Sequence, residues 1–240
     1  MSTINDLKKI SSKRLLHKAA SWLQKTEYRY FHKYTDPVNP DGLFGTLRKY
    51  RATEARISGP RDILLGGNSR MHAMEVLFES LVPNSACVAL SGDWTDEEES
   101  RLDDTFFPYQ PKIIFDEIGG NNVLRGEAVS KIIEDKKRIY DKQHAKAAHV
   151  FLFEICPLGP KLSALHPEFN DKIREINAKT TLFAGPDNMI AVTAPLTDQN
   201  GVMRPEFNAG DDVHHSVLAY LNVYMPGVQE KLLQVRYGAA

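Results

Sequence analysis

Five short apolar runs that alternate with helical segments constrain the fold of this chain more than any other feature. The runs begin after the turn at Gly59-Pro60. They are Ile63–Gly66, Ala86–Leu90, Lys112–Phe115, Val150–Ile155 and Met189–Val192, and the helical segments are Met71–Leu81, Glu97–Asp103, Glu127–Ala147, Glu168–Asn177 and Ser216–Tyr224. Strands that are apolar along nearly their whole length are typical of a parallel sheet with helices on both faces. The sequence therefore predicts an α/β fold.

Residues that suit catalysis stand directly after three of these runs. Ser69 follows the first run in Gly67-Asn68-Ser69-Arg70-Met71, Gly92 follows the second, and Asn121 follows the third in Gly119-Gly120-Asn121-Asn122. Open α/β sheets bind their ligands beyond the carboxyl ends of the strands. We therefore expect Ser69, Gly92 and Asn121 to meet at one rim of the sheet.

The C-terminal segment Asp211-Asp212-Val213-His214 supplies the partners that a serine nucleophile needs. An imidazole takes the hydroxyl proton, and a carboxylate holds that imidazole in the correct tautomer. The tetrahedral intermediate then needs donors for its oxyanion. The backbone N–H groups of Ser69 and Gly92 and the side-chain amide of Asn121 can supply them. Ser69, His214 and Asp211 are thus candidate catalytic residues for acyl transfer.

The ordered set of Ser69, Gly92, Asn121 and Asp211-x-x-His214 resembles the SGNH (GDSL-type) serine hydrolase superfamily, over about residues 60 to 225. The resemblance implies a flavodoxin-like three-layer sandwich around a five-stranded parallel sheet in the order 2-1-3-4-5. It implies a hydrolase domain at residues 59–240, preceded by a helical extension at residues 1–58. It also implies that Asn121, rather than Asn122, takes part in the oxyanion hole.

Two residues of the serine block depart from the motif that it resembles. Asn68 stands where Gly-Asp-Ser has aspartate, and we expect activity to survive this change because the acid of the triad precedes the histidine. Arg70 stands where an apolar residue is common. A guanidinium there either favours an anionic substrate or points into solvent, and we favour the second interpretation.

The histidine assignment has an alternative of the same spacing. Asp212 and His215 form a second Asp-x-x-His pair, displaced by one residue from Asp211 and His214. The resemblance favours the first pair. His214 and His215 do not indicate a metal site, since neighbours in sequence point apart and no other residues have ligand spacing. The glycine pairs do not form a phosphate-binding loop, and we expect no cofactor.

Composition is compatible with a soluble enzyme but does not identify one. The 240 residues are 42% hydrophobic and carry a net charge of −1, which argues against bulk nucleic-acid binding. No run approaches the roughly 20 apolar residues of a membrane span, and the N-terminus lacks the features of a signal peptide, so we expect a cytoplasmic protein. Cys87 and Cys156 would lie about 14 Å apart across three strand spacings. We therefore expect buried thiols, because a disulfide needs Cα atoms within about 7 Å.

The N-terminal extension is basic. Residues 1–60 hold 12 Lys and Arg against 5 Asp and Glu. Apolar residues in 4–25 recur at near-helical spacing with lysines and arginines between them, and residues 35–42 carry turn residues throughout. We expect a basic amphipathic helix packed across the hydrolase domain. The alternatives are contact with an anionic membrane surface and recruitment of a partner.

Three functions remain from the sequence. The leading one is a serine esterase that removes a small acyl group from an ester, such as an acetylated carbohydrate, through an acyl-enzyme at Ser69. An O-acyltransferase would use the same residues with a hydroxyl acceptor in place of water. The third is a non-catalytic binding module with the same fold. The sequence leaves the oligomeric state open.

Overall fold

A computed structural model of the chain describes residues 43–237. The predicted helix at 4–25 and the connector at 35–42 lie outside the described residues. From Leu47 onward the chain forms one compact unit. Its five strands are β1 (Ile63–Leu65), β2 (Ser85–Cys87), β3 (Ile113–Asp116), β4 (His149–Phe153) and β5 (Met189–Ile190). All neighbouring strands are parallel, in the order β2-β1-β3-β4-β5, which confirms the predicted fold class and topology.

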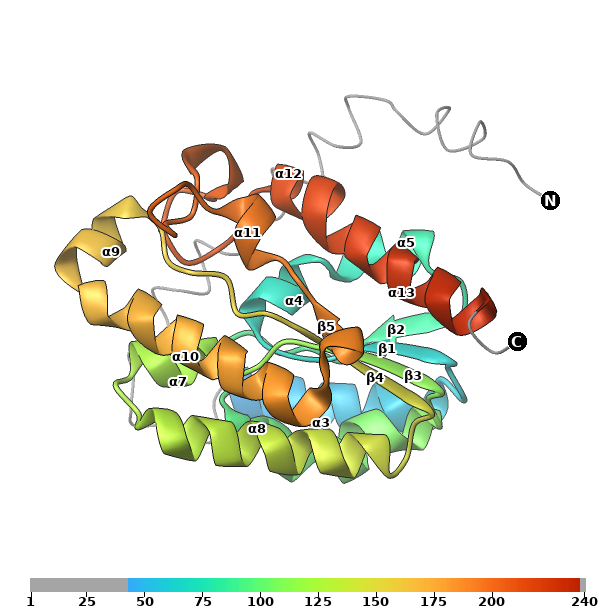
Figure 1. The fold of residues 1–240 in the computed structure, drawn as a ribbon. Helices are drawn as coiled ribbons and strands as arrows, with labels where there is room; N and C mark the ends of the chain where they lie inside the picture. Colours follow the sequence, from blue (N-terminus) through green and yellow to red (C-terminus); the bar gives the residue numbers. More distant parts are fainter. Residues whose placement is uncertain (1–42, 238–240) are drawn as a thin grey trace. The chain divides into compact units, whose positions relative to one another are not determined.

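Helices and turns connect the strands (Figure 1). Before and around the first three strands lie α3 (Leu43–Ile57), α4 (Ser69–Ala73), α5 (Glu75–Leu81), α6 (Thr95–Arg101), the π-helical turn η2 (Leu102–Phe106) and the 3₁₀ turn η3 (Phe107–Tyr109). Then follow α7 (Gly120–Leu124), α8 (Val129–His144), α9 (Pro160–Leu165), α10 (Pro167–Ala184) and η4 (Pro186–Asn188). The C-terminal part holds α11 (Thr193–Leu196), η5 (Pro205–Phe207), α12 (Val217–Ala219), η6 (Tyr220–Tyr224) and α13 (Met225–Tyr237).

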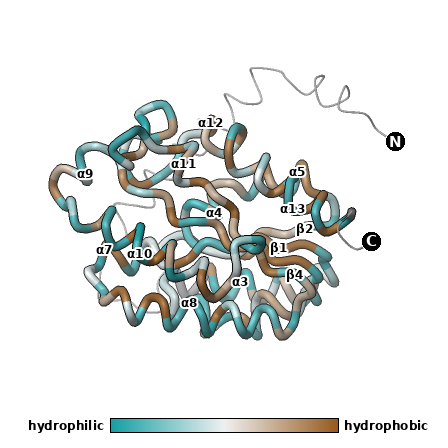
Figure 2. The backbone as a smooth tube through the Cα atoms, in the orientation of Figure 1, coloured by the Kyte–Doolittle hydropathy of each residue, from teal (hydrophilic) through white to brown (hydrophobic). Residues whose placement is uncertain are grey.

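Each strand sends alternate side chains to two apolar clusters, one on each face of the sheet. Leu65 and Phe115 point to the face covered by α5, η6 and α13, where they meet Phe78 and Tyr224. Leu64, Ile114 and Val150 point to the other face and meet side chains of α3, η2 and α8. The strands are coloured hydrophobic in Figure 2, whereas α8 alternates along its length. Two buried faces explain why the strand runs are almost continuously apolar.

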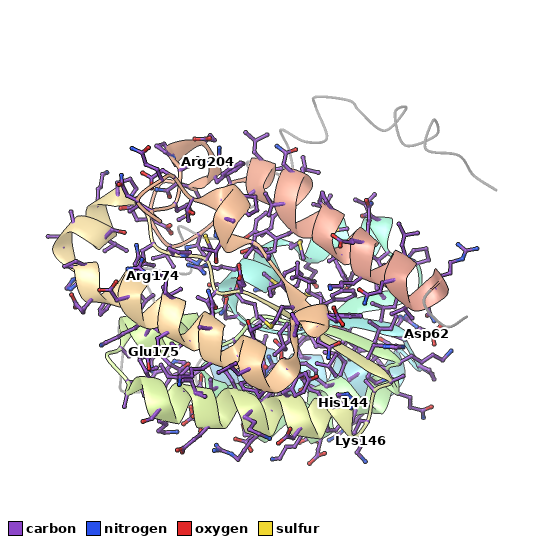
Figure 3. All side chains as sticks on the ribbon, in the orientation of Figure 1. Asp62, His144, Lys146, Arg174, Glu175 and Arg204 are labelled. Carbon is purple, nitrogen blue, oxygen red and sulfur yellow. The ribbon has the colours of Figure 1, made fainter. Side chains whose placement is uncertain are left out.

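Charged and polar side chains are exposed on the outer surface of α8 and α10. The side chains of His144, Lys146, Arg174 and Glu175 are exposed on or near α8 and α10 (Figure 3). Within the described residues, no helix is long and apolar enough to cross a membrane. Both cysteines are free and buried, as predicted. Burial raises the pKa of the Cys156 thiol to about 12 and that of Cys87 further.

Helix α3 falls within the segment that we expected to be a separate extension. Ala55 packs into the cluster beneath the sheet, and Arg51 pairs with Glu75 of α5 at 2.8 Å. Arg48 pairs with Glu97 of α6 at 2.7 Å. Residues 48–55 of the predicted extension therefore contact the α/β unit, and the boundary at residue 58 stays a prediction.

Some predicted element bounds were wrong. The expected helix 71–81 is two helices, because the N–H of Met74 bonds to the carbonyl of Met71 and tightens the turn there. The expected helix 216–224 continues as α13 to Tyr237 despite Pro226 and Gly227. A Cβ at Gly227 would lie 2.5 Å from a methyl of Ile190, so this glycine lets α13 approach β5 closely.

Candidate active site

The turn that leads from β1 to Ser69, residues 66–69, is called the serine turn below, and it contains two glycines whose positions have no room for a side chain. Gly67 has φ of +116°, and a Cβ there would lie 2.4 Å from the carbonyl oxygen of Glu117. A Cβ on Gly66 would lie 2.6 Å from the ring of Phe106. Asn68 then caps α4 by accepting the backbone N–H of Arg70 at 3.0 Å. Ser69 is consequently the first residue of α4, at the carboxyl end of β1.

The structure brings Ser69, His214 and Asp211 together. The Nε2 atom of His214 lies 2.8 Å from Ser69 Oγ, and Nδ1 lies 2.5 Å from Asp211 Oδ2. The other carboxylate oxygen of Asp211 accepts the backbone N–H groups of Val213 at 2.9 Å and His214 at 2.8 Å. The hydroxyl, imidazole and carboxylate therefore form one hydrogen-bonded chain, the arrangement that activates a serine.

The neighbours of Asp211 stabilise its ionised form. Burial alone would raise the pKa of its carboxyl group, but hydrogen bonds and charge from His214, together with the N–H of Val213, outweigh burial and lower it well below its ordinary value. Asp211 is therefore an ionised acceptor for the ring N–H of His214. That hydrogen bond leaves Nε2 of His214 as the acceptor for the serine proton.

The second Asp-x-x-His pair is not brought to Ser69. Asp212 accepts the backbone N–H groups of Lys161 at 2.6 Å and Leu162 at 2.9 Å, so it caps α9. His215 is buried against the rings of Tyr220 and Tyr224, and neither of its ring nitrogens has a hydrogen-bond partner among the described residues. Desolvation, aided by the charges of Arg70 and His214, lowers the pKa of His215 well below its ordinary value.

The asparagine block also divides between two roles. Gly119 has φ of +107° and starts the turn into α7, which carries both asparagines. The amide of Asn121 lines the pocket beside Ser69 and donates one N–H to the carbonyl of Asp93 at 2.9 Å. A primary amide has a second N–H. Asn122 is buried and accepts the N–H of Thr95 at 3.2 Å. This bond joins α7 to α6.

Gly92 lies on a loop whose neighbouring residues, Leu90 and Ser91, are held by hydrogen bonds. Its φ of +86° favours glycine, and Leu90 just before it still pairs with the backbone of Gly67 at 3.0 Å. The hydroxyl of Ser91 lies 2.8 Å from Nδ1 of His72, whose Nε2 is 3.3 Å from Glu75. Ser91 is not among the described residues that line the pocket beside Ser69. We interpret its contact with His72 as an anchor for this loop.

Arg70 corrects an expectation from the sequence. Its side chain does not point into solvent, because the residue is only 4% exposed. Its guanidinium donates to the carbonyl oxygens of Val213 at 2.9 Å and Cys156 at 3.0 Å, and it lies 3.6 Å from Glu117. Burial lowers the pKa of Arg70, but Glu117 and other neighbours raise it on balance, so the group is a cation.

Two buried acids near the site were missed by the sequence analysis. Asp93 is paired with Arg101 at 2.5 Å, and its backbone carbonyl holds Asn121. Glu117 lies behind Asn68 and Arg70 and is fully buried. The sequence does contain a sign of Glu117, because two charged residues, Asp116 and Glu117, end an otherwise apolar strand and could have indicated a buried acid.

A pocket opens beside Ser69. It is mostly apolar away from the serine, and its lining residues are Asn68, Ser69, Arg70, Gly120, Asn121, Val123, Leu124, Leu158, Ile173 and Val213. Among residues 43–237, no three histidine, cysteine or acidic side chains gather in a way that could hold a metal ion. The arrangement suits binding of a small apolar group next to a nucleophilic hydroxyl.

Comparison with known proteins supports the fold. No family model and no curated protein matches this sequence. Among solved structures, a GDSL-like lipase from Bacteroides thetaiotaomicron has a TM-score of 0.66 at 15% identity, and the match covers 82% of this chain and 100% of that one. The chain has the fold of the SGNH hydrolases.

Two further structures share that fold. An acetylxylan esterase from Geobacillus stearothermophilus matches with a TM-score of 0.51 at 13% identity, covering 72% of this chain and 95% of the esterase. The OSK domain of Drosophila Oskar matches with a TM-score of 0.58 at 18% identity, covering 70% of this chain and 86% of the domain. At these identities the likeness concerns the fold alone.

Proposed function

We propose that the protein is a serine esterase that removes a small acyl group through an acyl-enzyme at Ser69. The observation that carries this proposal is the chain of contacts from Ser69 through His214 to Asp211, at 2.8 Å and 2.5 Å. A serine hydroxyl bonded to an imidazole, which is in turn bonded to an ionised carboxylate, is arranged for nucleophilic attack on an ester. The GDSL-like lipase and acetylxylan esterase that share the fold support the same reaction class.

The reaction proceeds in two half-reactions. Ser69 Oγ attacks the ester carbonyl carbon while His214 Nε2 takes the hydroxyl proton. The tetrahedral intermediate collapses, the bond to the alcohol oxygen breaks, and His214 returns the proton to that oxygen. Water then attacks the acyl-enzyme with His214 again as the base, which releases the carboxylic acid and restores the hydroxyl of Ser69.

Three donors stabilise the oxyanion in this proposal. They are the backbone N–H of Ser69, the backbone N–H of Gly92, and the N–H of Asn121 that is not used by Asp93. The bond from Asn121 to the carbonyl of Asp93 fixes the amide plane before substrate binds, and preorganised donors are the effective ones. Asn121 is thereby oriented toward the pocket that contains Ser69.

The acyl group in this proposal is short and uncharged. The apolar side chains that line the pocket beside Ser69 include Val123, Leu158 and Ile173, each at most 1% exposed, and we infer that these packed side chains leave little room for a long chain. Acetyl esters, including acetylated carbohydrates, fit this description. The alcohol part of the substrate lies outside this pocket.

Hydrolysis of p-nitrophenyl esters of increasing chain length tests the proposal. The acetate and propionate should be the best substrates, and Ser69→Ala should abolish their hydrolysis while the melting temperature stays unchanged. Ser91→Ala is the matched control, since Ser91 is the neighbouring serine with a histidine partner, and it should keep most of the activity. Retention of activity in Ser69→Ala would remove Ser69 from the reaction, and a preference for long chains would overturn the acyl assignment.

A further inference from the structure

Arg70, which follows Ser69, connects the serine turn to the loop that carries His214. This loop, residues 211–215, is called the histidine loop below. Arg70 Nε donates to the carbonyl oxygen of Val213 at 2.9 Å, and Val213 directly precedes His214. Nη1 donates to the carbonyl oxygen of Cys156 at 3.0 Å. The hydroxyl of Tyr220, beyond the histidine loop, donates to the backbone carbonyl of Arg70 at 2.9 Å. Arg70 therefore contacts both sides of the segment that carries His214.

Two side chains complete a buried network around this guanidinium. Glu117 lies 3.6 Å from Arg70 Nη1 and is the counter-charge. The amide of Asn68 donates to Glu117 at 3.4 Å, and its oxygen accepts the backbone N–H of Arg70 at 3.0 Å. All three residues are at most 4% exposed. The network contains one cation, one anion and one neutral amide, so its net charge is zero.

We propose that Asn68, Arg70 and Glu117 are positioning residues that hold His214 at hydrogen-bonding distance from Ser69. The proposal rests on the proposed function, in which His214 is the base. Ser69 lies between Asn68 and Arg70 in the sequence, and His214 follows the residue whose carbonyl accepts from Arg70. A change in the tilt of the guanidinium thus moves the nucleophile and the base relative to one another. A displacement of about 1 Å in such a geometry can cost about 100-fold in rate.

The amide at position 68 is required by its neighbour Glu117. Asn68 must accept from one partner and donate to the other, which an aspartate cannot do when ionised. Asp is as good a helix cap as Asn, so Asn68→Asp keeps the cap of α4. It places a second carboxylate beside buried Glu117, with only one guanidinium between them. Burial already raises the pKa of Glu117 and the charge of Asp116 adds to that rise, while Arg70, Asn68 and Lys136 oppose it.

The same network restricts what the pocket can recognise. Arg70 is among the residues that line the pocket, but its charge is balanced by Glu117 and its N–H groups are directed to backbone oxygens. It is therefore not offered to an anionic substrate. Uncharged acyl groups should be preferred over those with a terminal carboxylate.

A charge swap tests the positioning role. The variants are Asn68→Asp, Glu117→Gln, and the double variant, in which the aspartate accepts from the new glutamine amide and the net charge is again zero. Each single variant should lower kcat at least about tenfold with little change in KM, and should lower the melting temperature by about 5 °C. The double variant should recover most of both losses. Asn222→Asp and Glu134→Gln make the same chemical changes at exposed positions and should change neither quantity.

The pH dependence of Asn68→Asp separates charge repulsion from a local packing defect. Two adjacent buried carboxylates raise the pKa of one of them, so protonation at lower pH relieves the repulsion. The difference in melting temperature between Asn68→Asp and the unaltered protein should therefore shrink as the pH falls from about 8 to about 5. A constant difference, additive losses in the double variant, or unchanged single variants would each overturn the proposal.

The outcomes distinguish this proposal from the proposed function. The melting temperatures of the four proteins are read without a substrate, so they remain informative if Ser69→Ala proves to be active and the esterase mechanism fails. Recovery of the melting temperature in the double variant without recovery of kcat would show that the network supports folding but does not position His214. That result would overturn the positioning role while leaving Ser69 as the nucleophile.

Discussion

The loop with His214 and the loop with Asn121 each contain adjacent, chemically identical residues that have opposite environments. His214 reaches Ser69, whereas His215 is buried against tyrosine rings. Asn121 lines the pocket, whereas Asn122 joins α7 to α6. In both cases one residue contacts Ser69 or lines the pocket beside it, and its neighbour is directed elsewhere. Residue type and spacing therefore do not identify the functional member, and the direction of the side chain does.

The two loops achieve this separation by different means. In the histidine loop, Asp212 has φ of +65°, and this left-handed residue turns the chain between the carboxylate of Asp211 and His214. In the asparagine loop, Gly119 has φ of +107° and starts α7, on which consecutive residues point about 100° apart. The histidine loop therefore depends on a strained aspartate, and the asparagine loop on a glycine and a helix.

The largest expected difference is between the two histidines. His214→Ala should lower kcat by about 10³-fold or more, because the base that accepts the proton of Ser69 is lost. His215→Phe should retain most activity, since neither ring nitrogen of His215 has a hydrogen-bond partner among the described residues and phenylalanine is similar in shape. Steady-state kinetics on p-nitrophenyl acetate will compare the two. The reverse result would move the triad to Asp212 and His215.

The two aspartates should differ in the property that they affect. Asp211→Asn should lower kcat by about 10⁴-fold, since an amide cannot hold His214 in the same tautomer as a carboxylate. Asp212→Ala should mainly lower the free energy of unfolding, by about 1–2 kcal/mol, because α9 loses its cap. Kinetics and urea unfolding of both variants provide the comparison. A catalytic defect in folded Asp212→Ala larger than that of Asp211→Asn would contradict the assignment.

The two asparagines should separate kcat from stability. Asn121→Ala should lower kcat by about 10²–10³-fold with little change in KM, because one donor to the oxyanion is lost. Asn122→Ala should lower the free energy of unfolding by about 1–3 kcal/mol, because it leaves the buried N–H of Thr95 without its acceptor. Equal small effects from both variants would mean that the asparagine block is structural.

The smallest effect concerns the pH dependence of stability at His215. Its pKa is lowered in the folded protein, so below an unfolded pKa of about 6.5 the unfolded chain binds a proton that the folded chain does not. This residue should therefore reduce stability as pH falls below about 6.5, by at most about 1.4 kcal/mol per pH unit. The variant His215→Phe should lose less stability than the unaltered protein between pH 7 and pH 5. Parallel pH profiles of the two proteins would contradict this, because they would show that folding does not lower the pKa of His215.

The sequence predicted the sheet correctly, and it placed a candidate site at one rim of that sheet for the same physical reason. Buried parallel strands such as Ile113–Asp116 leave a recognisable apolar run, and the residues that follow their carboxyl ends converge at one rim. The choice between His214 and His215 could not come from spacing alone, since both pairs have it. It required the resemblance, or the positive φ of Asp212 that only the structure reveals.

The sequence does not show which residues far apart in the chain contact one another. The burial of Arg70 depends on Glu117 and on the carbonyl oxygens of Cys156 and Val213, which are far from it in the chain. Propensity describes only local preference, so it assigned the arginine to solvent. The long helix α13 was missed for a related reason, because Gly227 weakens a helix locally yet permits the close contact with Ile190 that packs it.

Covalent labelling of the protein with a fluorophosphonate, followed by peptide mapping, tests directly whether Ser69 is the nucleophile. Ser69 should carry a single adduct that blocks ester hydrolysis, and His214→Ala should carry none, because the hydroxyl is then no longer activated. The label should be unaffected in Ser91→Ala. Labelling on Ser91, or an unlabelled protein that still hydrolyses p-nitrophenyl acetate, would contradict the assignment of Ser69 as the nucleophile.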